Sequence, residues 1–341
     1  MYCCANCFHD KFLKEHIQTI STEVGDCSFC VSKNVNVINP EELYDLFVPV
    51  LELYEEEPKG KKLNDLLQEN WNTFKIRGKR KQIDLLTDIT GENNLNKKLF
   101  KAKSEADVSK TIQWEKFRWE LKHKNRFFPE MIHDKEELKV LFTHLTSQIK
   151  KSLKTRYYRA RIDDKFEFTG KKMKKPPVIL STNGRANPYG ISYLYLASNI
   201  NTAISEIRPY KNECITVAEF QAKDDLVLAD LRTPKDVISP FLLNGEFELN
   251  FILENMPFIS KLSEELSKPI NPKDANLEYL PSQFLCEFIK HVGYDGIVYN
   301  SSLAKGVNYA IFNDSKLKMT KKFRYKVDNI DVKSTEVKLS K

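Results

Sequence analysis

Apolar and polar residues follow one another along the first part of the chain with the spacing of helices. In the segments 40–49 and 135–145, Leu, Phe and Val recur three or four positions apart among glutamates and lysines. That spacing places the apolar side chains on one face of an amphipathic helix. The stretch 8–20 has the same character. The pattern therefore predicts a largely helical region that extends to about residue 150.

A different pattern begins after about residue 152. Short apolar runs of strand length alternate with helical segments and with turns that contain Gly or Pro. The runs lie at 178–180, 193–197, 214–220, 226–231, 296–299 and 309–312. The predicted fold class is α+β, in which a helical N-terminal domain at 36–150 precedes a mixed α/β domain at 151–330 and a polar tail at 331–341.

Four cysteines near the N-terminus form two matched pairs. Cys4 and Cys7 make one Cys-x-x-Cys turn, and Cys27 and Cys30 make a second. Such a turn presents two thiolates from one tight loop, so two turns can close a tetrahedral shell around Zn²⁺. We expect a structural zinc knuckle over residues 1–35, since a closed shell leaves no position for a substrate. Cys3 can replace Cys4 by a shift of one residue, although the matched spacing favours Cys4; free or buried thiols are the alternative.

The amino-acid composition limits which cellular compartment and which partners are expected for this protein. Seven cysteines, an odd number gathered mostly near one end, do not suit a disulfide scaffold, so a reducing compartment is expected. No apolar run has the length of a membrane span, and cysteines occupy the place of a signal-peptide core, so we expect a cytoplasmic protein with no membrane partner. The formal net charge of +7 suits nucleic acid or an anionic small substrate and does not choose between them.

Two segments of the second domain offer cationic side chains in apolar surroundings. On a strand over 156–161, alternation would direct Arg159 to one face and Tyr158 to the other, with the guanidinium fork aimed at an anion. In the turn at 183–190, Arg185 and Asn187 supply donors for a pyrophosphate or a ribose at close backbone approach. Surface ion pairing and a simple turn are the alternatives.

Two further segments carry a carboxylate and a hydroxyl. The strand at 193–197, which contains Tyr195, leads through an Asn/Ser cap into a helix that carries Glu206. Farther on, Pro281 and Ser282 open another helix. A charge on a helix face and an N-cap are the ordinary explanations, so residue chemistry alone leaves an active site and a purely structural role both open.

Taken together, these segments resemble the RES-domain family, which is named for an Arg, a Glu and a Ser. Here those residues would be Arg159, Glu206 and Ser282, in matching order and spacing over about 150–320. The cysteine-rich head and the helical region resemble longer RES proteins with a HEPN/RES N-terminal region. The resemblance implies an ADP-ribosyltransferase-like fold, NAD⁺ as substrate, and a toxin or defence role with an antitoxin or immunity protein as partner.

The chemistry that the resemblance implies fits these residue types. Cleavage of the nicotinamide–ribose bond develops positive charge on the ribose, which Glu206 would stabilise. Arg159 and Arg185 would hold the phosphates, with Asn187 as a further donor. Tyr195 and Tyr158 offer aromatic faces for nicotinamide, and Ser282 would hydrogen-bond its carboxamide or the ribose rather than act as a nucleophile. No Gly-x-Gly-x-x-Gly occurs, which argues against NAD⁺ as a hydride carrier.

Three functions remain open from the sequence. The first is an NAD⁺ glycohydrolase or phosphorylase, and the second is an ADP-ribosyltransferase that modifies a protein or nucleic acid; both use the same residues. The third is RNA binding or HEPN-type ribonuclease activity in the N-terminal region, where Arg118 and His123 match Arg-x₄-His and where aromatic and basic residues interleave. An ordinary surface Arg and His on a helix is the favoured explanation of that pair.

Overall fold

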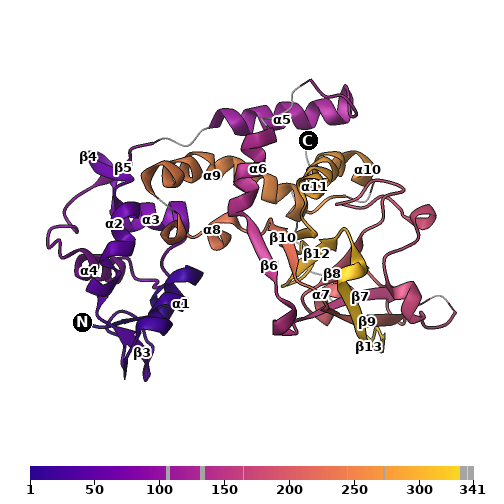
Figure 1. Ribbon diagram of the computed structural model, residues 1–341, viewed down its shortest axis with the longest axis horizontal. Helices are drawn as coiled ribbons and strands as arrows, with labels where there is room; N and C mark the ends of the chain where they lie inside the picture. Colours follow the sequence, from indigo (N-terminus) through magenta and orange to yellow (C-terminus); the bar gives the residue numbers. More distant parts are fainter. Residues whose placement is uncertain are drawn as a thin grey trace. The chain divides into compact units, whose positions relative to one another are not determined.

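The computed structural model describes residues 1–104, 108–130, 135–163, 165–243, 245–271, 273–330 and 336. The predicted polar tail at 331–341 lies outside these residues except for Glu336. Two compact units are formed (Figure 1). Unit 1 holds Met1–Trp119, Glu130–Leu145 and Thr233–Ser263, and unit 2 holds Glu120–Pro129, Thr146–Arg232 and Glu264–Lys341. The units are thus discontinuous in sequence, whereas the predicted boundaries at 35, 150 and 330 divide the chain linearly and stay a prediction.

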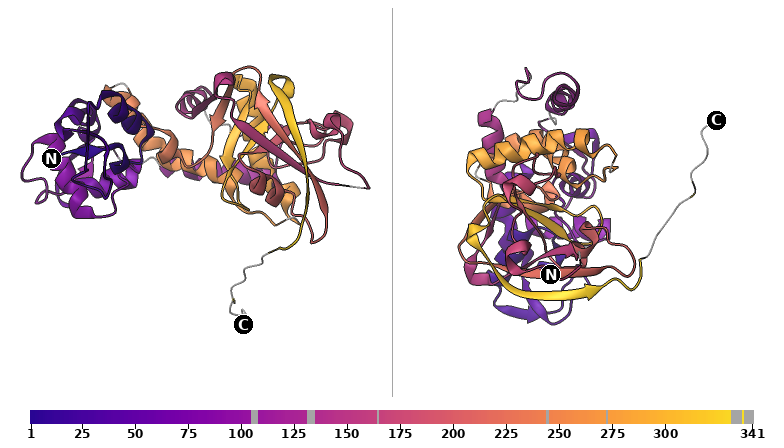
Figure 2. Two further views of the ribbon diagram at one scale, coloured as in Figure 1. Left: turned by 90° about the horizontal axis from the view of Figure 1, so that it is seen from below. Right: turned by 90° about the vertical axis from the view of Figure 1, so that its right-hand side faces the viewer.

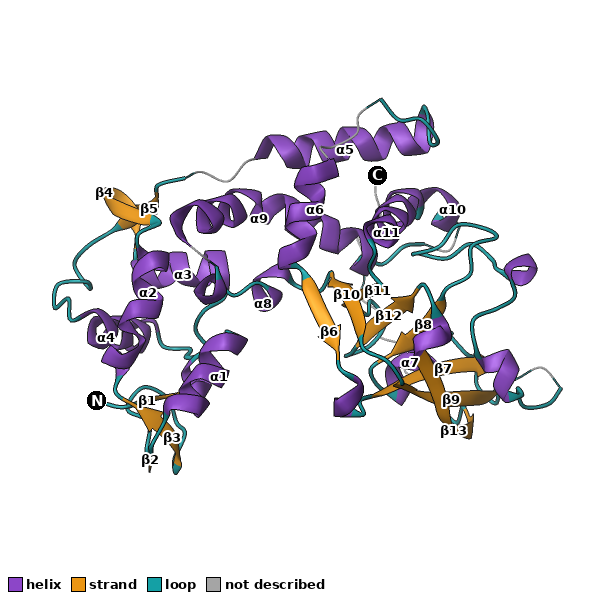
Figure 3. Cartoon of the chain, in the orientation of Figure 1, coloured by secondary structure: helices purple, strands orange, loops and turns teal. Residues whose placement is uncertain are grey.

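Unit 1 combines small antiparallel sheets with helices (Figure 3). Its three-stranded sheet has the order β1 (Cys3–Cys4), β3 (Val35–Ile38) and β2 (Glu23–Gly25). Helix α1 (Lys11–Ile20) begins after the N-cap Asp10, whose side chain accepts a hydrogen bond from the Leu13 amide at 2.8 Å. This cap explains why the predicted helix over 8–20 starts only at Lys11, because Asp10 satisfies an N–H group that the first turn leaves free.

The remaining elements of unit 1 follow the helical pattern of the sequence. They are α2 (Tyr44–Leu51), β4 (Tyr54–Lys61), α3 (Leu63–Trp71), α4 (Lys79–Thr90), β5 (Phe100–Ala102), α6 (Lys135–His144), α8 (Pro234–Val237) and the unit 1 parts of α5 (Val108–His123) and α9 (Gly245–Ser267). The helices predicted at 40–49 and 135–145 are confirmed by α2 and α6. Large aromatic side chains fill the core, among them Phe8, Phe47, Trp71 and Trp114.

Unit 2 is built on an eight-stranded sheet (Figure 2). All neighbouring strands are antiparallel except β10 and β11, which are parallel. The order is β13 (Leu317–Lys326), β9 (Cys214–Ala222), β7 (Arg156–Ile162), β8 (Leu194–Ala197), β12 (Val307–Ile311), β11 (Gly296–Asn300), β10 (Leu226–Asp230) and β6 (Thr146–Ile149). Its helices include α7 (Ile200–Glu206), α10 (Ala275–Glu278) and α11 (Leu280–Val292).

The sheet of unit 2 is nearly divided between β7 and β8. Strand β7 pairs with β9 along its whole length, and β8 pairs with β12 over four residues. Between β7 and β8, however, only Tyr158 and Ala197 are partners. The two strands therefore diverge on either side of this pair. The parts of β7 and β8 that do not pair with each other can line a cavity.

Most predicted strands are confirmed, and one is wrong. Strands form at five of the six apolar runs of the second domain, as β8, β9, β10, β11 and β12. The run Val178–Leu180 instead forms a short 3-10 turn whose middle residue, Ile179, is 94% exposed. Two prolines precede this run, and no strand among the described residues pairs with it, so its apolar composition alone cannot make it a strand. In the described part of the chain, no helix is both long and apolar enough to cross a membrane.

Candidate active site

A cavity of about 490 Å³ lies in unit 2 at the divergence of β7 and β8. Residues 158–160 of β7, 195–197 of β8, the loop 183–185 and the C-terminal end of α7 line it. Its volume falls in the range of small-molecule sites, about 300–1,000 Å³. Five of the predicted site residues line this cavity: Tyr158, Arg159, Arg185, Tyr195 and Glu206. Asn187 and Ser282 are not among the residues that line it.

Arg159 brings a largely buried positive charge to the cavity wall. Its Nη1 atom is buried and has no hydrogen-bond partner among the described residues. Burial, and secondarily the nearby charge of Arg161, lower the pKa of the Arg159 guanidinium to about 10. A buried guanidinium with an unpaired N–H donor is costly, and this arrangement is typical of a site that binds an anionic group.

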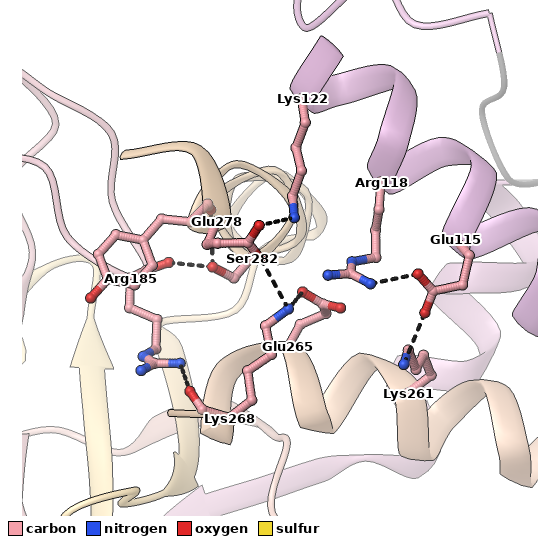
Figure 4. Close-up of polar contacts among 10 residues, drawn as sticks. Glu115, Arg118, Lys122, Arg185, Lys261, Glu265, Lys268, Glu278 and Ser282 are labelled. Atoms are coloured by element: carbon pink, nitrogen blue, oxygen red, sulfur yellow. Dashed lines mark hydrogen bonds and ion pairs between the residues drawn. The ribbon is translucent and has the colours of Figure 1, made fainter. Parts of the chain in front are cut away.

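Arg185 is fixed from several sides (Figure 4). Its Nη1 donates to the backbone oxygen of Lys268 at 2.8 Å. Its guanidinium carbon lies 5.5 Å from the centre of the Tyr279 ring, within cation–π range. The Ser282 hydroxyl lies 2.7 Å from the backbone oxygen of Arg185. Because both its backbone and its side chain are held, Arg185 presents a pre-oriented cation to the cavity.

Glu206 lies at the last turn of α7 and is held by one oxygen only. Its Oε1 atom accepts hydrogen bonds from Ser301 Oγ at 2.6 Å and from Asn308 Nδ2 at 2.7 Å. Its Oε2 atom has no hydrogen-bond partner among the described residues. Two neutral donors thus orient the carboxylate while one oxygen is left for a ligand. Burial, and then the charge of Glu206, raise the pKa of Tyr299, which keeps that neighbouring phenol protonated.

Asn187, which is buried, and Tyr195 form a hydrogen-bonded pair that supports the 183–187 loop. The Tyr195 hydroxyl donates to Asn187 Oδ1 at 2.6 Å and accepts from the Ala186 amide at 3.1 Å. A Cβ atom at Gly184 would lie 2.5 Å from Asn187 Oδ1 and 2.7 Å from the Tyr195 hydroxyl oxygen. Only glycine fits at this position, because any side chain would displace the pair.

Ser282 lies beneath the cavity wall instead of in it. Its side chain is fully buried near the start of α11. Its hydroxyl lies within hydrogen-bond distance of the backbone oxygens of Arg185 and Tyr279, at 2.7 and 3.0 Å. Because Ser282 is fully buried and does not line the cavity, its predicted contact with a ligand stays a prediction. Its hydroxyl contacts the backbone of Arg185, which does line the cavity.

Sequence reasoning missed several residues that belong to the site. Arg208 lines the cavity two residues after Glu206, in a left-handed backbone conformation with φ of 47°. Ser301 and Asn308, which hold Glu206, follow or lie on strands about one hundred residues later in the chain. Gln283 holds the 183–187 loop from α11. Only Arg208 carried a local signal, since it follows Glu206 at the end of the same predicted helix.

Comparison with protein families identifies the fold unit that carries this cavity. The sequence profile of the RES domain matches residues 156–328, just over half of the chain. The chain belongs to the RES-domain family. The cavity and all the site residues named above lie within the matched segment. The predicted family and the predicted combination of a cysteine cluster, a helical N-terminal region and a mixed α/β domain are confirmed.

Two further comparisons add little. Among solved structures, a chain of the M. tuberculosis MbcT–MbcA toxin–antitoxin complex is similar, with 11% sequence identity and a TM-score of 0.34. The match covers 57% of this chain and 93% of that chain. No curated protein matches the sequence.

The four cysteines predicted to bind zinc come together in unit 1. The Sγ atoms of Cys4, Cys7, Cys27 and Cys30 all lie within 4.8 Å of one another, with Cys4–Cys30 at 3.6 Å and Cys7–Cys27 at 3.4 Å. Four thiolates around Zn²⁺ at about 2.3 Å would place their sulfur atoms about 3.8 Å apart, which these separations approach. Cys3 is buried outside the cluster. The cluster therefore fits a tetrahedral metal ion.

Arg118 and His123, the ribonuclease-like pair, do not line the cavity of unit 2. Arg118 Nη1 contacts Glu115 at 2.5 Å, and Glu115 also pairs with Lys261 at 2.9 Å (Figure 4). His123 is exposed at the end of α5. Of the aromatic residues that suggested RNA binding, Trp114 and Phe117 are core residues, each 1% exposed, whereas Trp119, Phe127 and Phe128 are exposed. A catalytic role for the pair stays an untested prediction.

Proposed function

We propose that this RES protein cleaves NAD⁺ at the bond between nicotinamide and ribose. The observation that carries the proposal is the pairing, in one cavity, of a buried guanidinium atom without a partner and a carboxylate with one free oxygen. The Arg159 guanidinium would bind an anionic group, and the Glu206 carboxylate would stabilise an atom that becomes positively charged during the reaction. NAD⁺ offers both, a diphosphate and a glycosidic carbon.

The charge balance of the cavity supports a dinucleotide. Arg159, Arg185 and Arg208 face a single carboxylate, that of Glu206, among the described residues that line it. A diphosphate carries two negative charges, and guanidinium groups bind phosphate oxygens with paired hydrogen bonds. Arg185 is already oriented by Lys268 and Tyr279, so little conformational freedom would be lost on binding.

In this proposal Glu206 assists bond cleavage. When the C1′–N bond breaks, its electron pair goes to the pyridinium nitrogen, nicotinamide leaves as a neutral molecule, and the ribose ring becomes oxocarbenium-like. The anchored Glu206 carboxylate would stabilise this cation or orient the ribose hydroxyls through its free Oε2. Water, or phosphate, then adds to C1′ and releases a proton. Tyr158 and Tyr195 supply ring surface for the leaving group, and the buried Asn187 and Ser282 position the loop.

The resemblance to toxins of toxin–antitoxin pairs suggests the biological setting. Consumption of NAD⁺ in the cytoplasm would arrest growth, so a neutralising antitoxin or immunity protein is the partner that we expect. We further propose that Zn²⁺ occupies the Cys4–Cys7–Cys27–Cys30 cluster and stabilises unit 1.

The decisive experiment is mass spectrometry of NAD⁺ incubated with the purified protein, with and without phosphate. Nicotinamide and ADP-ribose, or a phosphorylated ADP-ribose when phosphate is present, are the expected products. Arg159→Ala should abolish turnover. Arg156→Ala is the matched control, because Arg156 lies on the same strand with its side chain 59% exposed and outside the cavity. Turnover that appears only with a protein or nucleic-acid acceptor would replace the proposal with ADP-ribosyl transfer.

A further inference from the structure

Helix α11 carries a buried glutamine directly after Ser282. Gln283 is 5% exposed and lies in the first turn of the helix. Its Nε2 atom lies 2.6 Å from Asn183 Oδ1, 2.8 Å from the Gly184 backbone oxygen and 3.1 Å from the Asn187 backbone oxygen. One side-chain amide therefore faces three acceptors of the same loop, about one hundred residues away in sequence.

The loop that Gln283 holds is the one that forms part of the cavity wall. Asn183, Gly184 and Arg185 all line the cavity. The Gly184 oxygen accepts no other hydrogen bond from the described residues. Removal of the amide would take away the donor that ties this partly buried loop to α11, so the loop would be free to change its conformation.

The rest of α11 does not depend on this contact. Its apolar face is buried through Leu285, Cys286 and Ile289, which are at most 1% exposed. The helix would therefore stay in place when Gln283 is replaced by an apolar residue of similar size. The contact of Gln283 with the loop can therefore be removed without loss of the helix α11 that carries it.

We infer that Gln283 is a positioning residue that fixes the 183–187 loop and, through it, holds Arg185 in the orientation that binds the phosphates of the substrate. This inference rests on the proposed function. Arg185 would contact the diphosphate equally before and during bond cleavage, because the phosphates lie away from the reacting carbon. Loss of its orientation should weaken substrate binding and leave the chemical step nearly unchanged.

The test is the kinetics of NAD⁺ cleavage by Gln283→Met, with Gln148→Met as the control, since Gln148 is an exposed glutamine of β6 outside the cavity. We expect Gln283→Met to raise KM on the order of tenfold while kcat stays within about threefold of the wild type. A purely structural role would instead reduce the active fraction, which lowers kcat and leaves KM unchanged. Gln283→Asn, which keeps the amide but shortens its reach, should give a smaller rise in KM and serves if the methionine variant does not fold.

A double variant decides whether the effect passes through Arg185. In an Arg185→Ala background, Gln283→Met should add less than about a twofold change in KM. An equal rise in both backgrounds, or an unchanged KM in folded Gln283→Met, would overturn the inference. Wild-type protein without NAD⁺ cleavage would overturn the proposed function instead. In that event, hydrogen exchange of the peptide that contains 183–187 tests the loop directly: faster exchange in Gln283→Met supports the positioning role, and unchanged exchange refutes it.

Discussion

Replacement of Arg159 by methionine should stabilise unit 2 while it abolishes ligand binding. The guanidinium is largely buried, its Nη1 has no partner among the described residues, and its pKa falls from the ordinary 12.5 to about 10. That difference corresponds to about 3 kcal/mol of unfavourable free energy in the folded state. Methionine of similar length removes the charge, so we expect the free energy of unfolding to rise by about 1–3 kcal/mol.

The direction of the Arg159 pKa change determines the pH range in which Arg159→Met is more stable than the wild type. A base whose pKa is lowered by folding disfavours the folded state at every pH below its folded pKa, where it is protonated in both states. At pH 7 the whole penalty is therefore present in the wild type. It is relieved only as the pH rises above about 10, so the difference between variant and wild type should be constant between about pH 6 and 9.

The assay can separate the two units, because all three tryptophans, Trp71, Trp114 and Trp119, belong to unit 1. Urea unfolding followed by far-ultraviolet circular dichroism should show the gain, whereas the tryptophan fluorescence transition should not move. Added ADP-ribose should raise the melting temperature of the wild type but not that of Arg159→Met. A variant that is less stable than the wild type by more than about 1 kcal/mol, or one that ADP-ribose stabilises equally, would refute the reasoning.

Four other outcomes are expected. Glu206→Gln should lower kcat for NAD⁺ cleavage by roughly 100-fold or more, with ADP-ribose affinity by calorimetry within a few-fold of the wild type; a kcat near that of the wild type would exclude the carboxylate from the reaction. Gly184→Ala should destabilise unit 2 by about 1–3 kcal/mol in urea unfolding and raise KM, because the added Cβ would displace Asn187. Unchanged stability and KM would show that the loop accommodates the added methyl group. Elemental analysis should find one zinc per chain. Cys27→Ser should lose this zinc and lower the urea midpoint of the tryptophan fluorescence transition. Zinc that is retained in Cys27→Ser would mean that the metal binds elsewhere. Arg118→Ala should leave the rate of NAD⁺ cleavage unchanged. A loss of NAD⁺ cleavage in this variant would favour a function for the helix that carries Arg118.

The sequence by itself predicted what local spacing determines. Two Cys-x-x-Cys turns bring four thiols close together through short-range geometry, and the structure places those four sulfur atoms in one cluster. Alternation over 156–161, the apolar run at 214–220 and the helix start at Pro281 and Ser282 likewise predicted β7, β9 and α11, because each signal lies within its own segment. The segments around Tyr158–Arg161, Gly184–Gly190, Tyr195, Glu206 and Ser282, in their order and spacing along the chain, together carried the family resemblance.

Tertiary structure decided what depends on distant partners. An apolar run such as Val178–Leu180 becomes a strand only where another strand pairs with it, and no strand of the described part of the chain does. The hydroxyl of Ser282 is buried on the Arg185 backbone, and Glu206 is held by Ser301 and Asn308, because hydrogen-bond partners are set by which segments fold together. Spacing in one segment carries no information about these long-range contacts, so only the folded chain shows which polar residues face the cavity and which support it from behind.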